Sequence, residues 1–210
     1  LLFLNSNVVV NKCLVQQYIK SITLKRGLVF AGNRQYEKSN DLILEKYLNH
    51  KKRGLNQFSN NILICYKYLL FDNCMIHTSV FEAVKINLKL KYYGGEELDF
   101  AYRVNNLFPN KIFSCKSAFV IRIGYPKYKE HCSRLIEFGN TNLKQLSLPL
   151  KKEMVKSLFF LKKRNIIKYI INYIYILSMR HYNTRISFLN YYIIRLGMWS
   201  SILKGYYQSR

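Results

Sequence analysis

Blocks of apolar and polar positions along the chain predict an α/β domain. Short, wholly apolar runs predict buried strands, with Leu1–Leu4 as a parallel strand and Gly27–Ala31 and Ile62–Cys65 after it. Between and after these runs, Cys13–Ile22 and Glu96–Arg103 have apolar residues at helical spacing. Polar residues border the apolar runs, and open α/β sheets place their ligands at strand ends of this kind.

The same patterns predict further elements on both sides of the Glu96 helix. They are a helix or loop over Asn40–Arg53, a helix over Lys67–Phe71, an amphipathic stretch over Val80–Leu90, two strands around a turn over Asn110–Cys115 and Ser117–Ile123, and a helix over Glu130–Leu146 interrupted near Gly139. Residues 151–210 hold twelve basic residues and one acid among long Ile, Tyr, Phe and Leu stretches. We therefore expect an α/β domain over residues 1–148 and a basic, aromatic-rich tail of two or three helices over residues 149–210.

The composition narrows the classes of partner. The chain has 34 Lys and Arg residues against 11 acidic residues and a net charge of +23, which favours anionic partners. Its five cysteines are odd in number, widely spaced and without a Cys-x-x-Cys pair. That arrangement argues against a disulfide framework or a zinc site and indicates a reducing compartment.

The densest acidic cluster directly follows a glycine pair. Glu96, Glu97 and Asp99 come after Gly94 and Gly95. One interpretation is structural: acids in the first turn of a helix interact favourably with the helix dipole. The other is chemical: the glycine turn holds a carboxylate that takes a proton from a substrate hydroxyl.

With these motifs in view, the chain resembles the inverting family 2 glycosyltransferases of the bacterial surface-polysaccharide type, which have the Rossmann-like GT-A fold. The family's strand followed by Asp-x-Asp resembles Phe3-Leu4-Asn5-Ser6-Asn7, and its Gly-Gly-Glu-Asp motif resembles Gly94-Gly95-Glu96-Glu97. Its small polar segment before an acceptor-side strand resembles Ser59-Asn60-Asn61, and Arg122 stands near the place of a metal-contacting His. The resemblance covers roughly residues 1–145, so we expect the amino-terminal half of such a domain to be missing.

The resemblance implies transfer of a sugar from a nucleotide-diphosphate donor to an acceptor hydroxyl of a cell-surface polysaccharide or lipid-linked glycan. It implies Glu97 as the catalytic base with Glu96 positioning it or the acceptor, and an acceptor side that includes Asn61, Gly94 and Gly95. Asn5 and Asn7 stand where carboxylates would hold Mn²⁺ or Mg²⁺, and neutral amides should weaken that binding. Arg122 cannot ligate a metal, but its guanidinium can hold a diphosphate.

Three other interpretations stay open from the sequence. The chain can be a catalytically degenerate relative that acts as a membrane-surface or binding module. Its charge alone would suit nucleic acid, yet it has no nucleic-acid motif and its acidic cluster would repel phosphates, so we expect no nucleic-acid partner. The basic, aromatic tail suits an anionic lipid surface, which places the protein in the cytoplasm, on the inner face of the cell membrane.

Overall fold

The structure is a computed structural model and describes residues 1–38, 41–155, 164–182 and 187–208. The chain forms two compact units: the first comprises Leu1–Asn40, Leu48–Asn87 and Glu96–Tyr125, and the second comprises Asp41–Tyr47, Leu88–Gly95 and Pro126–Arg210. The mixed α/β class expected from the sequence is confirmed. The finer prediction of a GT-A fold, and the domain boundary near residue 148, stay predictions.

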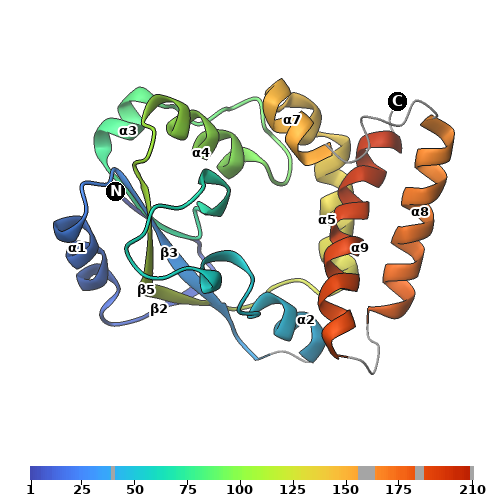
Figure 1. The fold of residues 1–210 in the computed structure, drawn as a ribbon, viewed down its shortest axis with the longest axis horizontal. Coiled ribbons are helices and arrows are strands. Elements are labelled where there is room, and N and C mark those ends of the chain that lie inside the picture. The colour runs from blue at the N-terminus through green and yellow to red at the C-terminus, as the bar shows by residue number, and fades with distance from the viewer. Residues whose placement is uncertain (39–40, 156–163, 183–186, 209–210) are drawn as a thin grey trace. The chain divides into compact units, whose positions relative to one another are not determined.

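A five-stranded sheet organises the first unit, in the order β1-β4-β3-β5-β2. Its strands are β1 (Leu2–Leu4), β2 (Val8–Val10), β3 (Val29–Tyr36), β4 (Asn73–Ile76) and β5 (Ile112–Arg122). β3 and β5 run parallel, and the other three neighbouring pairs are antiparallel. Figure 1 shows β3 and β5 side by side in the centre of this unit.

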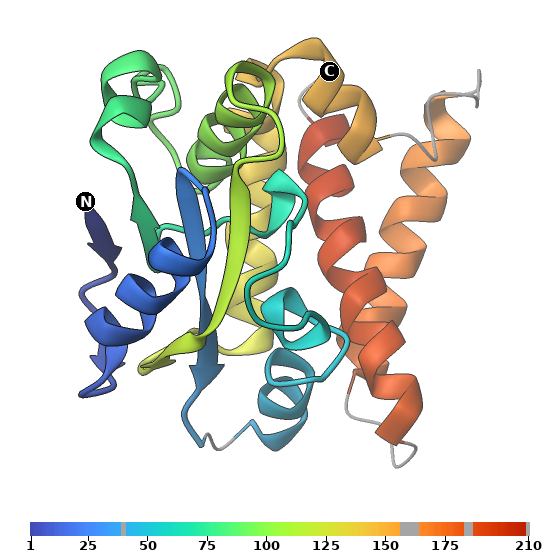
Figure 2. The same cartoon turned by 60° about the vertical axis from the view of Figure 1, so that its left-hand side comes forward.

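Each face of the sheet carries its own apolar cluster. Phe30 of β3 packs with Leu14 and Tyr18 of helix α1 (Leu14–Leu24), which crosses the sheet in Figure 2. Val29 and Ala31, the neighbours of Phe30, join the other cluster, to which helix α4 (Glu96–Leu107) contributes three buried residues, Phe100, Ala101 and Val104. Side chains alternate across a strand, so successive residues of β3 supply two cores. The remaining helical elements of this unit are η1 (Gly54–Gln57), η2 (Tyr66–Tyr68) and α3 (Thr78–Ala83).

The structure corrects several expectations for the strands. The run Leu1–Leu4 forms an outer strand antiparallel to β4, with Leu2 and Leu4 exposed, because only Phe3 packs against the core cluster. The run Ile62–Cys65 forms only a single bridge, between Leu63 and Phe113, and the strand lies later, at β4. An apolar run of four residues gives no information about which neighbour it will pair with.

Two further expectations change in detail. The two strands predicted at Asn110–Cys115 and Ser117–Ile123 are one strand, β5, whose register with β3 shifts between Gly32 and Asn33. The interruption at Lys116 and Ser117 is therefore a bulge rather than a turn. The helix predicted over Lys67–Phe71 reduces to the short element η2, and the amphipathic stretch predicted over Val80–Leu90 is helical only at its start, in α3.

The second unit is helical. It contains most of α2 (Leu42–Leu48) together with α5 (Tyr128–Asn140), α6 (Asn142–Gln145), α7 (Leu148–Val155), α8 (Arg164–His181) and α9 (Ser187–Gln208). The break predicted near Gly139 and the helices predicted for the tail are confirmed, although residues 156–163, 183–186 and 209–210 of the tail lie outside the described residues. None of the helices in the described part of the chain has the length and hydrophobicity needed to span a bilayer.

Glycines let two helices of the second unit approach closely. A Cβ added at Gly139 of α5 would collide with the backbone oxygen of Ile202, and one added at Gly205 of α9 would collide with that of Ile136. Figures 1 and 2 show α8 and α9 running side by side in the same unit. Close backbone packing thus sets the position of α9 against α5.

Candidate functional site

A buried carboxylate, Asp72, is in contact with two arginines of the first unit. It directly precedes β4, and its Oδ2 atom accepts hydrogen bonds from Nη1 of Arg34 on β3 and from Nη1 of Arg122 at the end of β5, the latter at 2.7 Å. Its Oδ1 atom accepts a bond of 3.3 Å from the Asn5 side-chain amide. We call Asn5, Arg34, Asp72, Glu97 and Arg122 the Asp72 cluster.

The arginines decide the charge state of Asp72. Burial alone would raise the pKa of this carboxyl, but the positive charges of Arg34 and Arg122, with the hydrogen bonds from Arg34 and Asn5, hold it below its ordinary value. Asp72 is therefore ionised at neutral pH. Two guanidinium groups face this one carboxylate, so the three side chains together carry a net positive charge.

Glu97 lies in the first turn of α4, and its Oε1 atom accepts a hydrogen bond of 2.9 Å from the backbone N–H of Phe71, next to Asp72. Burial is the main cause that raises the pKa of Glu97 to about 7, and the negative charge of Asp72 adds to it. The Phe71 N–H and Arg34 act in the opposite direction. A carboxylate with this pKa can accept a proton near neutral pH and release it again.

The two asparagines expected at a metal site lie at the outer strands. Asn5 Oδ1 accepts bonds of 3.4 Å from the backbone N–H of Asn7 and from the Ser6 hydroxyl. The backbone oxygen of Asn7 accepts a 3.0 Å bond from Ile123 N, which places Asn7 beside the end of β5. Among the described residues, Asn7 Oδ1 and Arg122 Nε are buried without a hydrogen-bond partner. They are the two polar atoms of this region that a ligand could satisfy.

A divalent cation does not fit these side chains well. Both oxygens of Asp72 already accept bonds from Arg34, Arg122 or Asn5. The described part of the chain contains no group of three or more His, Cys, Asp and Glu side chains arranged to hold a metal ion. Mn²⁺ and Mg²⁺ favour carboxylate oxygens, whereas Asn5 and Asn7 offer neutral amides. In this arrangement the positive charges beside Asp72 are the guanidinium groups of Arg34 and Arg122.

The other acids of the motif have distinct surroundings. Asp99 and Arg103 are four residues apart, a spacing that predicts a surface pair. The pair forms, with a 2.9 Å hydrogen bond from Arg103 Nε to Asp99, but Asp99 is buried. Glu96 is partly exposed, and its Oε2 atom is buried without a partner among the described residues. The acids of the first turn of α4 thus lie where they interact favourably with the helix dipole, and Glu97 also lies beside Asp72. Proton transfer from a substrate hydroxyl stays a prediction.

Gly94 and Gly95 belong to the second unit, and their backbone conformation explains why both are glycine. Both have positive φ values, +81° and +93°, which side chains disfavour. The Asn142 amide donates to the Gly94 oxygen at 2.8 Å, and a Cβ added at Gly95 would lie 2.8 Å from Phe138. Their predicted role in acceptor binding stays a prediction.

Asn61 also has a local structural role. It has a φ of +59°, and its backbone N–H donates to the Ser114 oxygen of β5 at 2.9 Å. Beyond Asn61, the run expected as an acceptor-side strand forms only the bridge between Leu63 and Phe113, and the predicted role of Asn61 in acceptor binding stays a prediction. Asn73 is fully bonded: it donates to Asn33 O and Ala118 O and accepts from the Tyr18 hydroxyl.

The structure thus brings Asn5 and Arg122 into contact with Asp72, and it places Glu97 on the neighbouring Phe71 N–H, close enough to interact with the charge of Asp72. Sequence reasoning missed Asp72 and Arg34. The scarcity of acids that drew attention to Glu97 applies equally to Asp72, which directly follows the apolar residues Leu69-Leu70-Phe71. No protein-family model matches the chain, and no curated protein matches it.

Proposed function

We propose that the chain is part of an inverting glycosyltransferase that moves a sugar from a nucleotide-diphosphate donor to an acceptor hydroxyl in a cell-surface polysaccharide or lipid-linked glycan. The observation that carries this proposal is Glu97, a half-buried carboxylate that accepts a hydrogen bond from the Phe71 N–H, next to the Asp72 carboxylate that Arg34 and Arg122 contact. Burial and the charge of Asp72 raise the pKa of Glu97 to about 7. Glu97 supplies a proton acceptor, and Arg34 and Arg122 supply positive charge. Inverting sugar transfer needs both.

In the proposed reaction, Glu97 accepts the proton of the acceptor hydroxyl. The acceptor oxygen forms a bond to the anomeric carbon while the bond from that carbon to the diphosphate oxygen breaks. The electron pair of the broken bond leaves with the diphosphate, and the configuration at the anomeric carbon inverts. Glu96, at the same helix start, is proposed to position the acceptor or Glu97.

Positive charge must neutralise the departing diphosphate as its charge develops. Arg34 and Arg122 together exceed the single charge of Asp72, and Arg122 has a buried Nε–H without a partner among the described residues. Guanidinium groups bind phosphate oxygens through paired hydrogen bonds. We therefore propose that Arg122, rather than a Mn²⁺ or Mg²⁺ ion held by Asn5 and Asn7, holds the diphosphate.

The test is turnover of a panel of radiolabelled nucleotide sugars by the full chain, with Mn²⁺ and with a chelator. Glu97→Gln should lower turnover by about 10² to 10⁴ fold because it removes the proton acceptor. Glu82→Gln, at an exposed acid on α3, is the matched control and should leave turnover unchanged. Absence of both turnover and donor binding across the panel would instead favour the degenerate relative.

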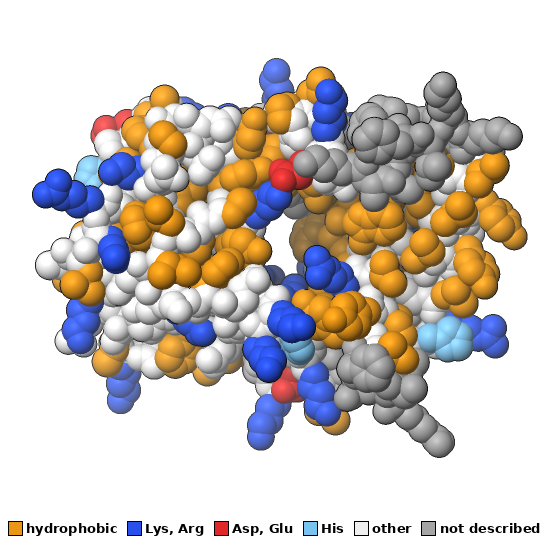
Figure 3. Space-filling view, viewed as in Figure 1, with side chains coloured by type: hydrophobic (Ala, Val, Ile, Leu, Met, Phe, Trp, Pro, Cys, Tyr) orange, Lys and Arg blue, Asp and Glu red, His pale blue; other side chains and the backbone are white. Residues whose placement is uncertain are grey.

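A second candidate function, contact with an anionic membrane surface, has its own support in the second unit. One face of α8 carries six large apolar side chains that are 38–77% exposed, namely Ile166, Tyr169, Ile170, Tyr173, Ile176 and Leu177. The opposite face, with Ile167 and Ile171, is buried. Figure 3 shows hydrophobic side chains gathered over α8. The sequence has no acidic residue after Glu153, so nothing there repels anionic headgroups.

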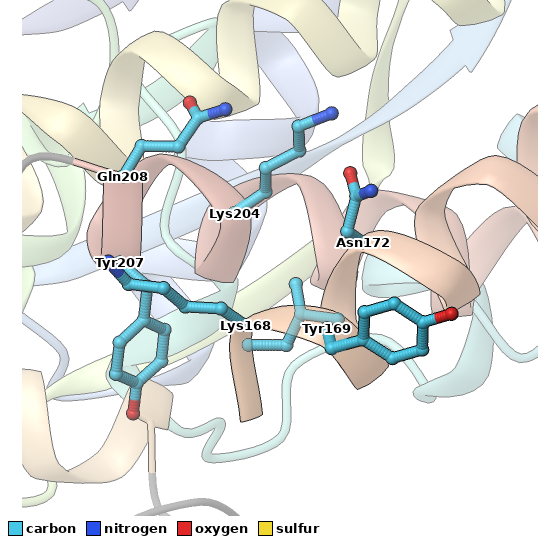
Figure 4. A pocket seen from close by; sticks show the side chains of 7 residues that line it. Lys168, Tyr169, Asn172, Lys204, Tyr207 and Gln208 are labelled. Atoms are coloured by element: carbon cyan, nitrogen blue, oxygen red, sulfur yellow. The ribbon is translucent and has the colours of Figure 1, made fainter. Parts of the chain in front are cut away.

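A hollow between α8 and α9 adds basic groups beside this face. Its volume is about 450 Å³, and Figure 4 shows Lys168 and Tyr169 of α8 and Lys204 and Tyr207 of α9 among the side chains that line it. Lys204 lies 4.0 Å from the centre of the Tyr175 ring, and burial lowers its pKa. Basic groups at the rim of an apolar, tyrosine-bearing helix face suit the headgroup layer of an anionic bilayer.

Vesicle co-sedimentation of the full chain tests this second candidate. Vesicles with phosphatidylglycerol should retain the protein at low salt, and pure phosphatidylcholine vesicles should retain it much less. Tyr169→Ser with Tyr173→Ser should reduce retention, whereas Leu88→Ser, at an 83% exposed leucine outside α8, should not. Equal retention of all variants, or dimer formation through α8 in sedimentation analysis, would contradict membrane contact by this face.

A further inference from the structure

The first unit contains a cavity of about 300 Å³ beside the Asp72 cluster. It adjoins the cluster because Arg34, which bonds to Asp72, is also one of its lining residues. Its other lining residues come from β3, from η1 and its surroundings, and from η2 and its surroundings. They are Gly32, Asn33, Tyr36, Leu48, Arg53, Gly54, Leu55, Asn56, Lys67, Tyr68 and Leu70.

The lining of this cavity is positively charged. Three of its side chains, Arg34, Arg53 and Lys67, are cationic, and none of the described lining residues is acidic. The Tyr36 ring lies 5.0 Å from the Arg34 guanidinium and 5.8 Å from that of Arg53. Burial alone would raise the pKa of Tyr36, yet the charges of Arg34 and Arg53 outweigh burial and lower it. The lowered pKa means that the negatively charged form of Tyr36 is favoured, so the electrostatic potential at its hydroxyl is positive.

Hydrogen bonds between elements hold the cavity in shape. The buried Asn33 side chain donates to Asn56 Oδ1 at 3.0 Å, which ties the bulged part of β3 to η1. Arg53 Nη1 donates to the Leu48 oxygen at 3.3 Å. Gly54 has a φ of +53° and no atom within 4 Å of the place of a Cβ, so its backbone is open to the cavity that it lines. The basic groups are thus positioned before any ligand arrives.

We propose that this cavity binds the phosphate group of a sugar phosphate, with the sugar ring against Tyr36 or Tyr68. Guanidinium and ammonium groups bind phosphate oxygens, and aromatic rings pack against the apolar faces of sugars. The volume lies at the low end of small-ligand pockets, which suits one sugar with its phosphate. This inference goes beyond the proposed transfer reaction, because it names a phosphorylated ligand for a cavity of which only one lining residue, Arg34, has a role in that reaction.

Titration calorimetry on the full chain tests the proposal without any need for turnover. The probes are glucose 1-phosphate, inorganic phosphate and glucose. Glucose 1-phosphate should bind saturably and more tightly than inorganic phosphate, because the sugar adds contacts with the tyrosines, and glucose alone should not bind measurably. Equal affinity for glucose 1-phosphate and glucose would overturn the proposal, since the cations would then contribute nothing.

Variants assign the binding to this cavity. Arg53→Gln should weaken glucose 1-phosphate binding by at least about tenfold, as expected for a charged hydrogen bond, and Lys67→Gln by about twofold to fivefold because this side chain is exposed. Arg53→Lys, which keeps the charge but loses the paired bonds, should fall between the wild type and Arg53→Gln. The circular dichroism spectrum of Arg53→Gln should match that of the wild type, which would show that the variant is folded.

Lys85→Gln is the matched control, because Lys85 is an exposed lysine of the same unit that does not line the cavity. It should leave the affinity unchanged. Equal weakening by Lys85→Gln and Lys67→Gln would show attraction to the net charge alone and would overturn the site. The cavity and the transfer reaction fail separately: loss of turnover with retained sugar-phosphate binding contradicts only the reaction, and the converse contradicts only the cavity.

Discussion

The Asp72 cluster of the first unit and the exposed face of α8 in the second unit use positive charge in different ways. In the cluster, Arg34 and Arg122 are partly buried and both bond to one carboxylate. On α8, exposed Ile and Tyr side chains share a helix with Lys168, Arg180 and no acid. The first arrangement depends on specific partners, whereas the second depends on an accumulation of like charges next to apolar surface.

This difference predicts which substitutions should change the stability of the fold. Removal of one partner from a buried ion pair leaves the other charge unpaired and destabilises the fold strongly. Substitution of an exposed apolar residue usually changes stability little. If both regions have the functions proposed, substitutions in the Asp72 cluster should lower both stability and turnover. Substitutions on the exposed face of α8 should weaken membrane binding without lowering stability.

The largest expected effect is that of Asp72→Ala. The change leaves Arg34 and Arg122 without their carboxylate and Asn5 Nδ2 without its acceptor, so the free energy of unfolding should fall by about 3 to 5 kcal/mol. Urea denaturation followed by circular dichroism measures it. Glu130→Ala removes an acid whose pair with Arg134 is exposed, and it should cost less than about 1 kcal/mol. Similar losses for both variants would contradict the contrast between buried and exposed charge.

The next effect is a pH dependence that originates from Glu97. Its pKa in the folded protein, about 7, lies above the ordinary value of 4.5. A carboxyl group with a raised pKa stabilises the fold fully below about pH 4.5, and this stabilisation is lost as the pH rises through 7. The loss amounts to about 2 to 3 kcal/mol.

Denaturation at a series of pH values should therefore show that Glu97→Gln flattens the decline between pH 4.5 and 7. Asp72 acts in the opposite direction, because its lowered pKa gives stability that is lost only as the pH falls through that value. An unchanged pH profile in Glu97→Gln would mean that Glu97 is not buried as described, and it would remove the main support for Glu97 as the base.

The third effect tests the packing of the second unit. Gly139→Ala should lower the free energy of unfolding by about 1 to 3 kcal/mol, because the new Cβ collides with the Ile202 backbone and α5 must move away from α9. The measurement is again urea denaturation. Ala83→Gly, at an exposed helix end of the first unit, is a control for the change of helix propensity and should cost about 1 kcal/mol or less. A stabilising Gly139→Ala would contradict the close approach of these helices.

Much of the fold followed from local patterns, and the exceptions have physical causes. The helices α1, α4 and α5 have strong amphipathic spacing, so their existence was predictable. The strands were less predictable, because their pairing partners are distant in sequence. β4 was missed because Asp72 directly precedes it and Asn73 is its first residue, and both are polar. Those residues are polar for a tertiary reason, as Asn73 bonds to Asn33, Ala118 and Tyr18.

The candidate site, too, could be predicted only in part from local sequence patterns. Glu97, Asn5 and Arg122 were predictable because each lies in a motif with a local signature. Arg34 and Asp72 lie in no such motif, and they meet only because β3 and β4 pair in the sheet. The cavity beside Arg34 was not predictable either, since its cations come from three separate stretches of the chain.

The smallest expected effect on stability is that of the double change Tyr169→Ser and Tyr173→Ser on α8. Both side chains are more than half exposed, so the free energy of unfolding should change by no more than about 0.5 kcal/mol per site. Ile171→Ser, on the buried face of the same helix, should cost several times more, because it removes a packed side chain and buries a hydroxyl. Denaturation of both variants in the absence of lipid compares the two faces of α8. Because vesicle binding should respond in the reverse order, strong destabilisation by the tyrosine changes would mean that this face packs against the protein itself and is not open to a membrane.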